Sequence, residues 1–143
     1  MPTKSTNEAP NASGTPLARK LGLKQGMAAW VIGAPQPYEG LFTEWPQADL
    51  NPKLPSGVQA DFIHLFARSF RELEDGLEAA VPRLKKSGML WISWPKKASG
   101  LASEIDKFDV MKAGQAIGLV DVKVASVNEV WSGHKFVIPL SRR

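Results

Sequence analysis

Basic and hydroxyl side chains follow two apolar segments at the points where these segments end. Arg68 and Ser69 come directly after the first segment, and Lys96, Lys97 and Ser99 come after the second. If both segments are parallel strands, their carboxyl ends share one edge of a sheet, where open α/β sheets bind ligands. Ser69 also begins an expected helix whose free N–H groups favour an anion. One hypothesis from these residues is an anionic ligand, a phosphate or carboxylate, between the two loops. The favoured interpretation is a solvated surface turn in which Ser69 only caps a helix.

Another apolar segment ends in Gly33, Ala34 and Pro35. In many α/β enzymes a glycine-rich turn at this point lets the backbone approach a nucleotide cofactor closely. Here a single glycine is followed by Ala34, which carries a Cβ, and by Pro35, which has no N–H to donate. Pro37 removes a second donor. The segment therefore has the shape of a cofactor turn with little of its binding capacity, and its three residues remain candidates for lining a ligand site.

Tryptophans lie close to the same expected edge. Trp91 and Trp94 differ by three positions, so an extended strand points them to opposite faces. Trp94 is beside Pro95 at the end of its segment, where it either stacks on a flat ligand or fills the space of a cofactor. We favour the second interpretation. Trp131, near the C-terminus, is a second-line candidate for the same pocket.

The two histidines are weaker candidates for chemistry. His64 lies in the middle of an apolar segment, which predicts a buried, hydrogen-bonded core residue. His134 follows a Ser-Gly turn, and we expect it to be exposed on an edge strand; the alternative is a pocket that it shares with Trp131. Two distant histidines and no cysteine predict no metal site. No serine lies in the G-x-S-x-G pattern of a nucleophile elbow.

The elements that would position these residues alternate between strands and helices. Expected strands cover 27–33, 60–67 and 89–94, with a weak edge strand within 46–57 and two C-terminal runs at 119–127 and 131–140. The link between the last two runs is too short for a parallel crossover, so they must form an antiparallel hairpin. This order predicts an α/β fold in three layers: a Rossmann-like, mostly parallel sheet with helices on both faces and a C-terminal antiparallel hairpin.

Two short helices are expected before the second strong strand. The first ends near Gly22 or Gly26, and the second follows Pro37 with an apolar face over 38–45. A third helix, 103–118, closes at Gly118 and is expected to turn four side chains toward the core. These are Ile105, Phe108, Met111 and Ile117.

The helix that follows the 60–67 strand has the clearest end signals. Ser69 and Glu72 have the spacing of a capping box, in which each side chain bonds the other residue's backbone N–H. Pro82 is expected to kink the helix or end it early. Lys85 and Lys86 suit the negative end of the helix dipole, and Gly88 is the expected stop.

The composition favours a single small domain. We expect residues 1–15 to be a flexible tail and residues 16–143 to form one domain. No apolar run is long enough to span a membrane, and the start of the chain lacks the apolar centre of a signal peptide. The net charge of +4 comes without an arginine-rich run, so a solvated basic surface is favoured over nucleic-acid binding. A cytoplasmic location is the expectation.

The sheet order and the segment "RLKKSGMLWISWP" resemble the S-adenosylmethionine-dependent methyltransferase fold. The chain is more similar still to a family of small bacterial proteins known only as a domain of unknown function. The matching stretches cover most of the chain after residue 15. They are "TPLARKLGLKQGM", "VIGAP", "LFARS", "LWISWPKKASG" and "GLVDVKVASVNEVWSGHKFV".

The methyltransferase resemblance implies S-adenosylmethionine as cofactor, a glycine-rich loop after the first strand and an acidic residue that closes the second. Only Gly33 matches the loop, and only Asp49 is available as the acid. A second acid, on the adenine side, has no clear counterpart before Ala60. The chain thus departs from the family pattern, so we expect no cofactor, with S-adenosylmethionine as the alternative.

Three functions remain open at this point. The favoured one is a non-catalytic binding or regulatory module with a degenerate methyltransferase-like fold and an anionic ligand. The second is a small S-adenosylmethionine-dependent methyltransferase, which rests on fold analogy. The third is an interaction protein, a homodimer or a partner of another protein, that pairs through "VWSGHKFVIP" as an edge strand.

Overall fold

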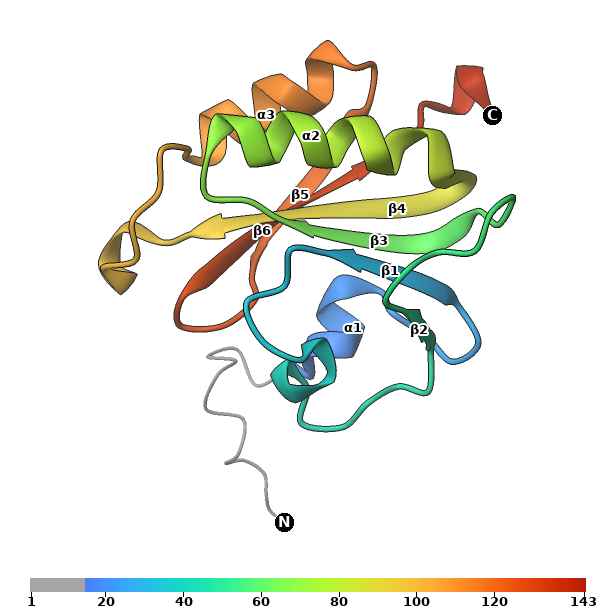
Figure 1. Cartoon of the computed structure of the whole chain (residues 1–143), viewed down its shortest axis with the longest axis horizontal. Coiled ribbons are helices and arrows are strands. Elements are labelled where there is room, and N and C mark those ends of the chain that lie inside the picture. Colours follow the sequence, from blue (N-terminus) through green and yellow to red (C-terminus); the bar gives the residue numbers. More distant parts are fainter. Residues whose placement is uncertain (1–14) are drawn as a thin grey trace.

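The computed structural model describes residues 15–143, which form one six-stranded sheet with helices on both faces (Figure 1). The predicted tail, apart from Thr15, lies outside the described residues. The strands are β1 (Ala28–Ile32), β2 (Asp49–Asn51), β3 (Ala60–Phe66), β4 (Leu84–Pro95), β5 (Val120–Ser126) and β6 (Trp131–Val137). The α-helices are α1 (Leu17–Leu21), α2 (Phe70–Ala80) and α3 (Lys107–Ala116). Short 3-10 helices are η2 (Tyr38–Leu41), η3 (Val81–Arg83), η4 (Lys97–Ser99) and η5 (Leu140–Arg142).

The sheet has the order β2-β1-β3-β4-β6-β5. Neighbours among the first four strands run parallel, whereas β6 runs antiparallel to both β4 and β5. The predicted three-layer, mostly parallel sheet with a C-terminal antiparallel hairpin is confirmed. The chain passes from β1 outward to β2 and then returns to β3 on the other side of β1, so the topological switch lies between β1 and β3.

Two hydrophobic cores lie on the two faces of the sheet. α2 and α3 cover one face, where Leu65, Ile92 and Phe136 are buried. α1 and η2 cover the other, where Trp91 is buried and donates its indole N–H to the Leu21 carbonyl at 2.8 Å. Trp94 belongs to the first core, so the expected opposite orientation of Trp91 and Trp94 is confirmed. Because residues 62–66 of β3 and 89–95 of β4 are covered on both faces, they are apolar apart from His64 and Ser93.

The helix predicted over 38–45 is shorter than expected. Only Tyr38–Leu41 is helical, as a single 3-10 turn, and Phe42 is already extended. Pro46 disfavours helical backbone at the residue before it, and so short a helix has little stability of its own. The apolar side chains of this segment still pack in the core, where Tyr38, Leu41 and Phe42 are buried.

The helix after Ser69 ends earlier than the predicted stop at Gly88. α2 ends at Ala80, as Pro82 indicated, but Lys85, Lys86 and Gly88 lie in β4 and do not end a helix. Ala60 pairs with Leu84 whereas Phe62 pairs with Met89, so residues 85–88 bulge out of the parallel ladder. After α2 only a 3-10 turn forms around Pro82. The chain then enters β4, although Lys85 and Lys86 had been expected at the end of a helix.

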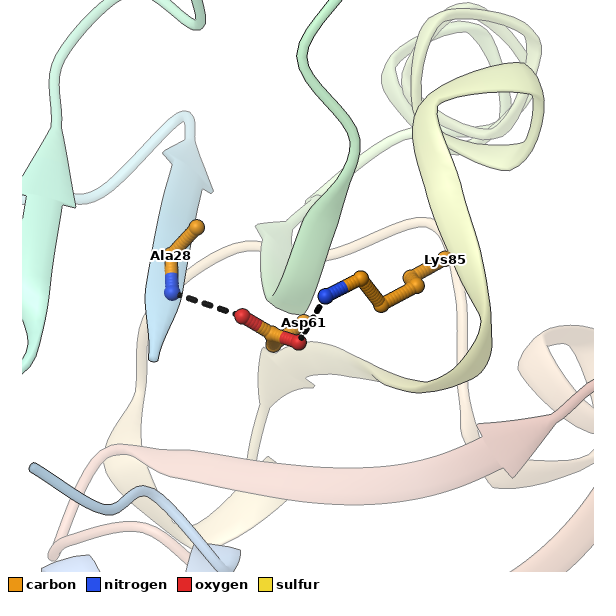
Figure 2. Close-up of polar contacts among 3 residues, drawn as sticks. All are labelled: Ala28, Asp61 and Lys85. Carbon is orange, nitrogen blue, oxygen red and sulfur yellow. Dashed lines mark hydrogen bonds and ion pairs between the residues drawn. The ribbon is translucent and has the colours of Figure 1, made fainter. Parts of the chain in front are cut away.

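Asp61 holds this bulge against the start of β1, as Figure 2 shows. Its carboxylate accepts the Ala28 backbone N–H at 2.9 Å and the Lys85 ammonium at 3.0 Å. Burial by itself would raise the pKa of Asp61, but these two hydrogen bonds and the Lys85 charge outweigh it and lower the pKa. Asp61 thereby ties β1, β3 and β4 together at the amino end of the sheet, opposite the edge of the candidate ligand site.

The inward face of α3 also differs from the prediction. Phe108 and Ile117 are 60% and 38% exposed, whereas Val110 and Gly114 are buried against the sheet. The helix begins after Asp106, in a capping box with Asp109, so Ile105 precedes it. Its orientation follows the Phe136 ring, which leaves no room for a Cβ at position 114. A local apolar pattern does not contain that information.

The edge strand at the C-terminal side is β5, not β6. β6 lies between β4 and β5, so the prediction that "VWSGHKFVIP" is an edge strand is wrong. The actual edge exposes Val120, Val122 and Val124, but a register shift after Asp121 interrupts its ladder and Lys123 lies on it. Bulges and lysines are devices that protect edge strands from pairing. No helix within residues 15–143 is long and apolar enough to cross a membrane.

Candidate functional site

A cleft of about 530 Å³ opens at the carboxyl ends of β1 and β3, at the topological switch. Open α/β sheets place their ligands at this point. Its lining brings together several residues singled out from the sequence with two acids of α2. They are Gly33, Pro35, Arg68 and Trp131, with Glu72 and Asp75.

Gly33 is required by the packing of the two strands. Its φ is 75°, in the left-handed region that favours glycine, and a Cβ there would lie 2.8 Å from the Phe66 carbonyl oxygen. Ala34 packs against the core on the α1 face, and Pro35 is exposed at the cleft. The one glycine of the loop thus allows β1 to approach β3, a demand that exists without any ligand.

The start of α2 is bound by the protein's own side chains. Ser69 Oγ accepts the Glu72 N–H at 3.0 Å, Glu72 accepts the Arg68 N–H at 2.7 Å, and Glu104 accepts the Phe70 N–H at 3.1 Å. The predicted capping box is only half present, because Glu72 bonds Arg68 and not Ser69. Two carboxylates at this helix start oppose an anionic ligand there.

The predicted basic cluster is divided. Arg68 lines the switch-point cleft and donates its Nε–H to the Ala102 carbonyl at 3.0 Å. Lys96 and Lys97 line a second cleft of about 390 Å³, together with Glu104 and Asp106. The structure therefore does not bring the lysines into one cleft with Arg68.

Ser99 and Lys96 have other partners. Ser99 Oγ donates to the Lys96 carbonyl at 2.7 Å and accepts the Leu101 N–H at 3.1 Å, which stabilises the turn after β4. The Lys96 ammonium donates to Ser126 Oγ at 2.7 Å, and the Lys20 ammonium donates to the Ser126 carbonyl at 2.8 Å. Sequence reasoning missed Lys20 and Ser126, which are 106 positions apart and share no local pattern.

Asp49 lies at the wrong end of the sheet to meet a ligand at Gly33. It pairs with Ala28, the first residue of β1, and the last residue of β2, Asn51, reaches only as far as Trp30. The acid that the methyltransferase resemblance required at the carboxyl end of β2 is therefore not supplied by Asp49. A short, displaced edge strand caused the difference.

His64 is buried in the core, as predicted, and both of its ring nitrogens are hydrogen-bonded. Nδ1 is 2.7 Å from the Tyr38 hydroxyl and Nε2 is 2.7 Å from Ser93 Oγ. Burial lowers the pKa of His64 to about 3 and raises the pKa of Tyr38. A neutral imidazole enclosed in this way holds Tyr38 and β4 together and has no free nitrogen for proton transfer.

His134 is buried, which corrects the prediction of an exposed residue. Only 3% of it is exposed, because β6 is an inner strand and the ring lies with Phe136 on the face of the sheet that α2 and α3 cover. Its ring stacks on Phe136, its Nε2 is 3.6 Å from an Asp121 carboxylate oxygen, and its Nδ1 has no hydrogen-bond partner among the described residues. Burial lowers the pKa of His134, although the Asp121 charge acts in the opposite direction. His134 lies in the middle of its strand, away from the cleft.

The two tryptophans of the predicted site are both buried. Trp94 is 6% exposed and packs in the core between the sheet and α2 and α3. Trp131 is 4% exposed and meets the Phe66 ring edge-on, with the ring centres 5.2 Å apart, where it forms part of the cleft wall. No group of three or more potential metal-ligating side chains is clustered within residues 15–143.

A family model described as a protein of unknown function, DUF3052, matches residues 58–140, more than half of the chain. No curated protein matches the chain. Among solved structures, a methyltransferase dependent on S-adenosylmethionine from Aquifex aeolicus is similar, with a TM-score of 0.62, 16% identity and coverage of 86% of this chain and 88% of that chain.

Two further structures share the fold. A putative type 11 methyltransferase from Sulfolobus solfataricus has a TM-score of 0.54 and 17% identity, covering 89% of this chain and 92% of that chain. A fibrillarin pre-rRNA processing protein from Methanococcus jannaschii has a TM-score of 0.58 and 13% identity, with 92% and 76% covered. At these identities the comparisons establish a methyltransferase-like, Rossmann-like fold and no activity.

Proposed function

Since the chain belongs to the DUF3052 family of proteins of unknown function, we propose a function from its own residues: a non-catalytic binding module that keeps a methyltransferase-like fold and takes an anionic ligand outside the switch-point cleft, near Lys20 and Lys96. The observation that carries the non-catalytic part of the proposal is the register of β2. Asp49 pairs with Ala28 at the amino end of the sheet, so it cannot face a ribose held at Gly33.

The residues around the switch-point cleft do not fit S-adenosylmethionine. Gly33 is used for the approach of β1 to Phe66, and Pro35 and Pro37 have no N–H to offer. The acids that line the cleft come from α2, where Glu72 bonds the Arg68 N–H and Asp75 is 3.6 Å from Arg71. The cleft therefore lies where the fold binds a cofactor, but it lacks the hydrogen-bond donors and acceptors that S-adenosylmethionine requires.

The histidines do not supply a general base at this edge. A general base must reach the proton that it removes and hold a pKa near the working pH. His64 is enclosed between Tyr38 and Ser93 with a pKa of about 3, and His134 is buried in the middle of β6. Neither position supports proton transfer to a substrate in the cleft.

A small S-adenosylmethionine-dependent methyltransferase is the second candidate. One observation favours it: a cleft of about 530 Å³ lies at the topological switch, the usual ligand position of the fold. The identities of 13–17% to the solved structures do not extend the methyltransferase activity to this chain.

Isothermal titration calorimetry separates the two candidates. We expect no saturable binding of S-adenosylmethionine tighter than about 1 mM, whereas inorganic pyrophosphate binds to the same sample. The Ala34→Gly/Pro35→Gly double variant serves as a matched comparison. It supplies loop glycines without supplying the missing acid, so it is also expected to give no S-adenosylmethionine binding.

Saturable S-adenosylmethionine binding by the unaltered protein would reject the non-catalytic module and support the methyltransferase. Gain of binding in the double variant alone would show that the loop, not the missing acid, is decisive, and would overturn the argument from Asp49. Absence of binding to pyrophosphate and to other phosphate or carboxylate probes would reject the anionic ligand.

A further inference from the structure

Four lysines from four separate segments form one group, through their contacts and charges, at the β4-β6-β5 side of the sheet. They are Lys20 of α1, Lys96 after β4, Lys123 of β5 and Lys135 of β6, called the lysine row below. We propose that the lysine row binds a small ligand with a diphosphate group. This inference rests on the proposed function, because it gives the anionic ligand a chemical class and a position.

Two members of the row converge on one residue. The Lys20 ammonium donates to the Ser126 carbonyl at 2.8 Å, and the Lys96 ammonium donates to Ser126 Oγ at 2.7 Å. Each ammonium has three N–H donors, so each keeps two for a ligand. Both contacts are partly buried, and the acceptors are neutral oxygens that leave the two positive charges uncompensated.

The other two members are direct cross-strand partners. Lys123 of β5 lies opposite Lys135 of β6. Gly133 packs against Trp91 on the α1 face, so Lys135, two residues further along, points to the same face, as does Lys123. Like charges directly opposite in a sheet are destabilising, so the pair is costly without a counter-ion.

No acid forms an ion pair with the row within the described residues, although Glu104 and Asp106 line the same cleft as Lys96. Within residues 15–143 the ion pairs join Arg71 to Asp75, Lys85 to Asp61 and His134 to Asp121, and none of them includes a lysine of the row. Burial lowers the pKa of Lys20, and the charges of Lys96 and Lys123 lower it further. Burial likewise lowers the pKa of Lys135, with a smaller contribution from Lys123. The four charges therefore act on one another as a connected group.

A diphosphate fits this arrangement better than a single carboxylate does. Lysine is a compact point charge that binds phosphate oxygens, and one phosphate can replace the neutral acceptors that Lys20 and Lys96 now share. A second phosphate would meet the charge of Lys123, which acts on Lys20, and that of its cross-strand partner Lys135. Lys96 directly follows β4, so this member of the row lies at the carboxyl edge of the sheet, and none of the four lysines lines the switch-point cleft.

The test compares pyrophosphate binding by calorimetry in the whole chain and in Lys20→Met, Lys123→Met and the double variant. We expect each single change to weaken binding about fivefold and the double change to weaken it more than tenfold. The matched control, Lys86→Met/Lys112→Met, removes two exposed lysines from outside the row and should leave the affinity within about twofold. Adenosine diphosphate and a single-stranded oligonucleotide are titrated in parallel.

The melting temperature without ligand distinguishes a weaker ligand site from a variant that fails to fold. Lys123→Met removes a like-charge contact, so its melting temperature without ligand should equal or exceed that of the unaltered protein while its pyrophosphate affinity falls. Equal affinity in the row variants and the control would overturn the lysine row while leaving an anionic ligand elsewhere. Tight binding of the oligonucleotide with none of pyrophosphate would overturn the small-ligand class. If no anion binds to the unaltered protein, both the row and the anionic part of the proposed function fail.

Discussion

Lowering the pH from 7 to 5 is expected to remove about 2 kcal/mol of the free energy of unfolding through His64 alone. Burial between Tyr38 and Ser93 lowers the pKa of His64 to about 3 in the folded protein, against about 6.5 in the unfolded chain. Between these two values the unfolded chain binds a proton that the folded protein does not. Stability is therefore complete above the unfolded pKa and decreases as the pH falls, reaching a loss of about 4 kcal/mol near pH 3.

Urea denaturation followed by tryptophan fluorescence at pH 7 and pH 5 measures this loss. The comparison variant is His64→Gln, which stays neutral and keeps hydrogen-bonding groups between Tyr38 and Ser93. We expect the variant to be less stable at pH 7 but to lose about 2 kcal/mol less on acidification than the unaltered protein. His134, also buried, titrates in the same direction in both proteins and cancels from the difference. Parallel losses in the two proteins would show that His64 is not held neutral by the core.

The second large effect is expected at Gly33. Gly33→Ala should lower the free energy of unfolding by about 3 kcal/mol, from left-handed backbone strain together with the clash of its Cβ with the Phe66 carbonyl. Gly57→Ala is a matched control, because Gly57 has a φ of 80° but no atom within 4 Å of an added Cβ. It should cost only about 1 kcal/mol.

The difference between these two variants isolates the close approach of β1 to β3. If Gly33→Ala and Gly57→Ala are equally destabilising, the contact with Phe66 is not restrictive. Gly33 would then be free for a ligand, as in a cofactor loop. Chemical denaturation of both variants gives the comparison.

Local sequence patterns were sufficient for the elements that are apolar throughout or have a clear cap. The strands around His64 and Trp91 are covered on both faces, so their sequences are apolar and could be recognised as strands. The apolar neighbours of His64 also predicted that it is buried in the core. The end of α2 near Pro82 followed from the missing N–H of proline. These features depend on residues that are close in the sequence.

Features that depend on register or on distant neighbours were not predictable in this way. His134 was expected on an edge strand, but β6 lies between two other strands. Asp49 was expected at the carboxyl end of β2, but β2 pairs with the first residues of β1, so Asp49 lies at the amino end of the sheet. The orientation of α3 depends on the fit of Gly114 against Phe136. The candidate site shows the same limit: Lys96 was identified from its position after a strand, but its neighbour Lys20 comes from the other end of the chain.

Whether the edge at Gly33 still holds S-adenosylmethionine is measured most directly by NMR. Amide and indole signals of the 15N-labelled protein are followed while the cofactor is added to about 1 mM, and then while pyrophosphate is added to a second sample. We expect the amides of Gly33 and Arg68 and the indole of Trp131 to stay in place with S-adenosylmethionine, and the amides around Lys96 and Ser126 to shift with pyrophosphate. Saturable shifts at Gly33, Arg68 and Trp131 on addition of S-adenosylmethionine would contradict a fold that has lost its cofactor.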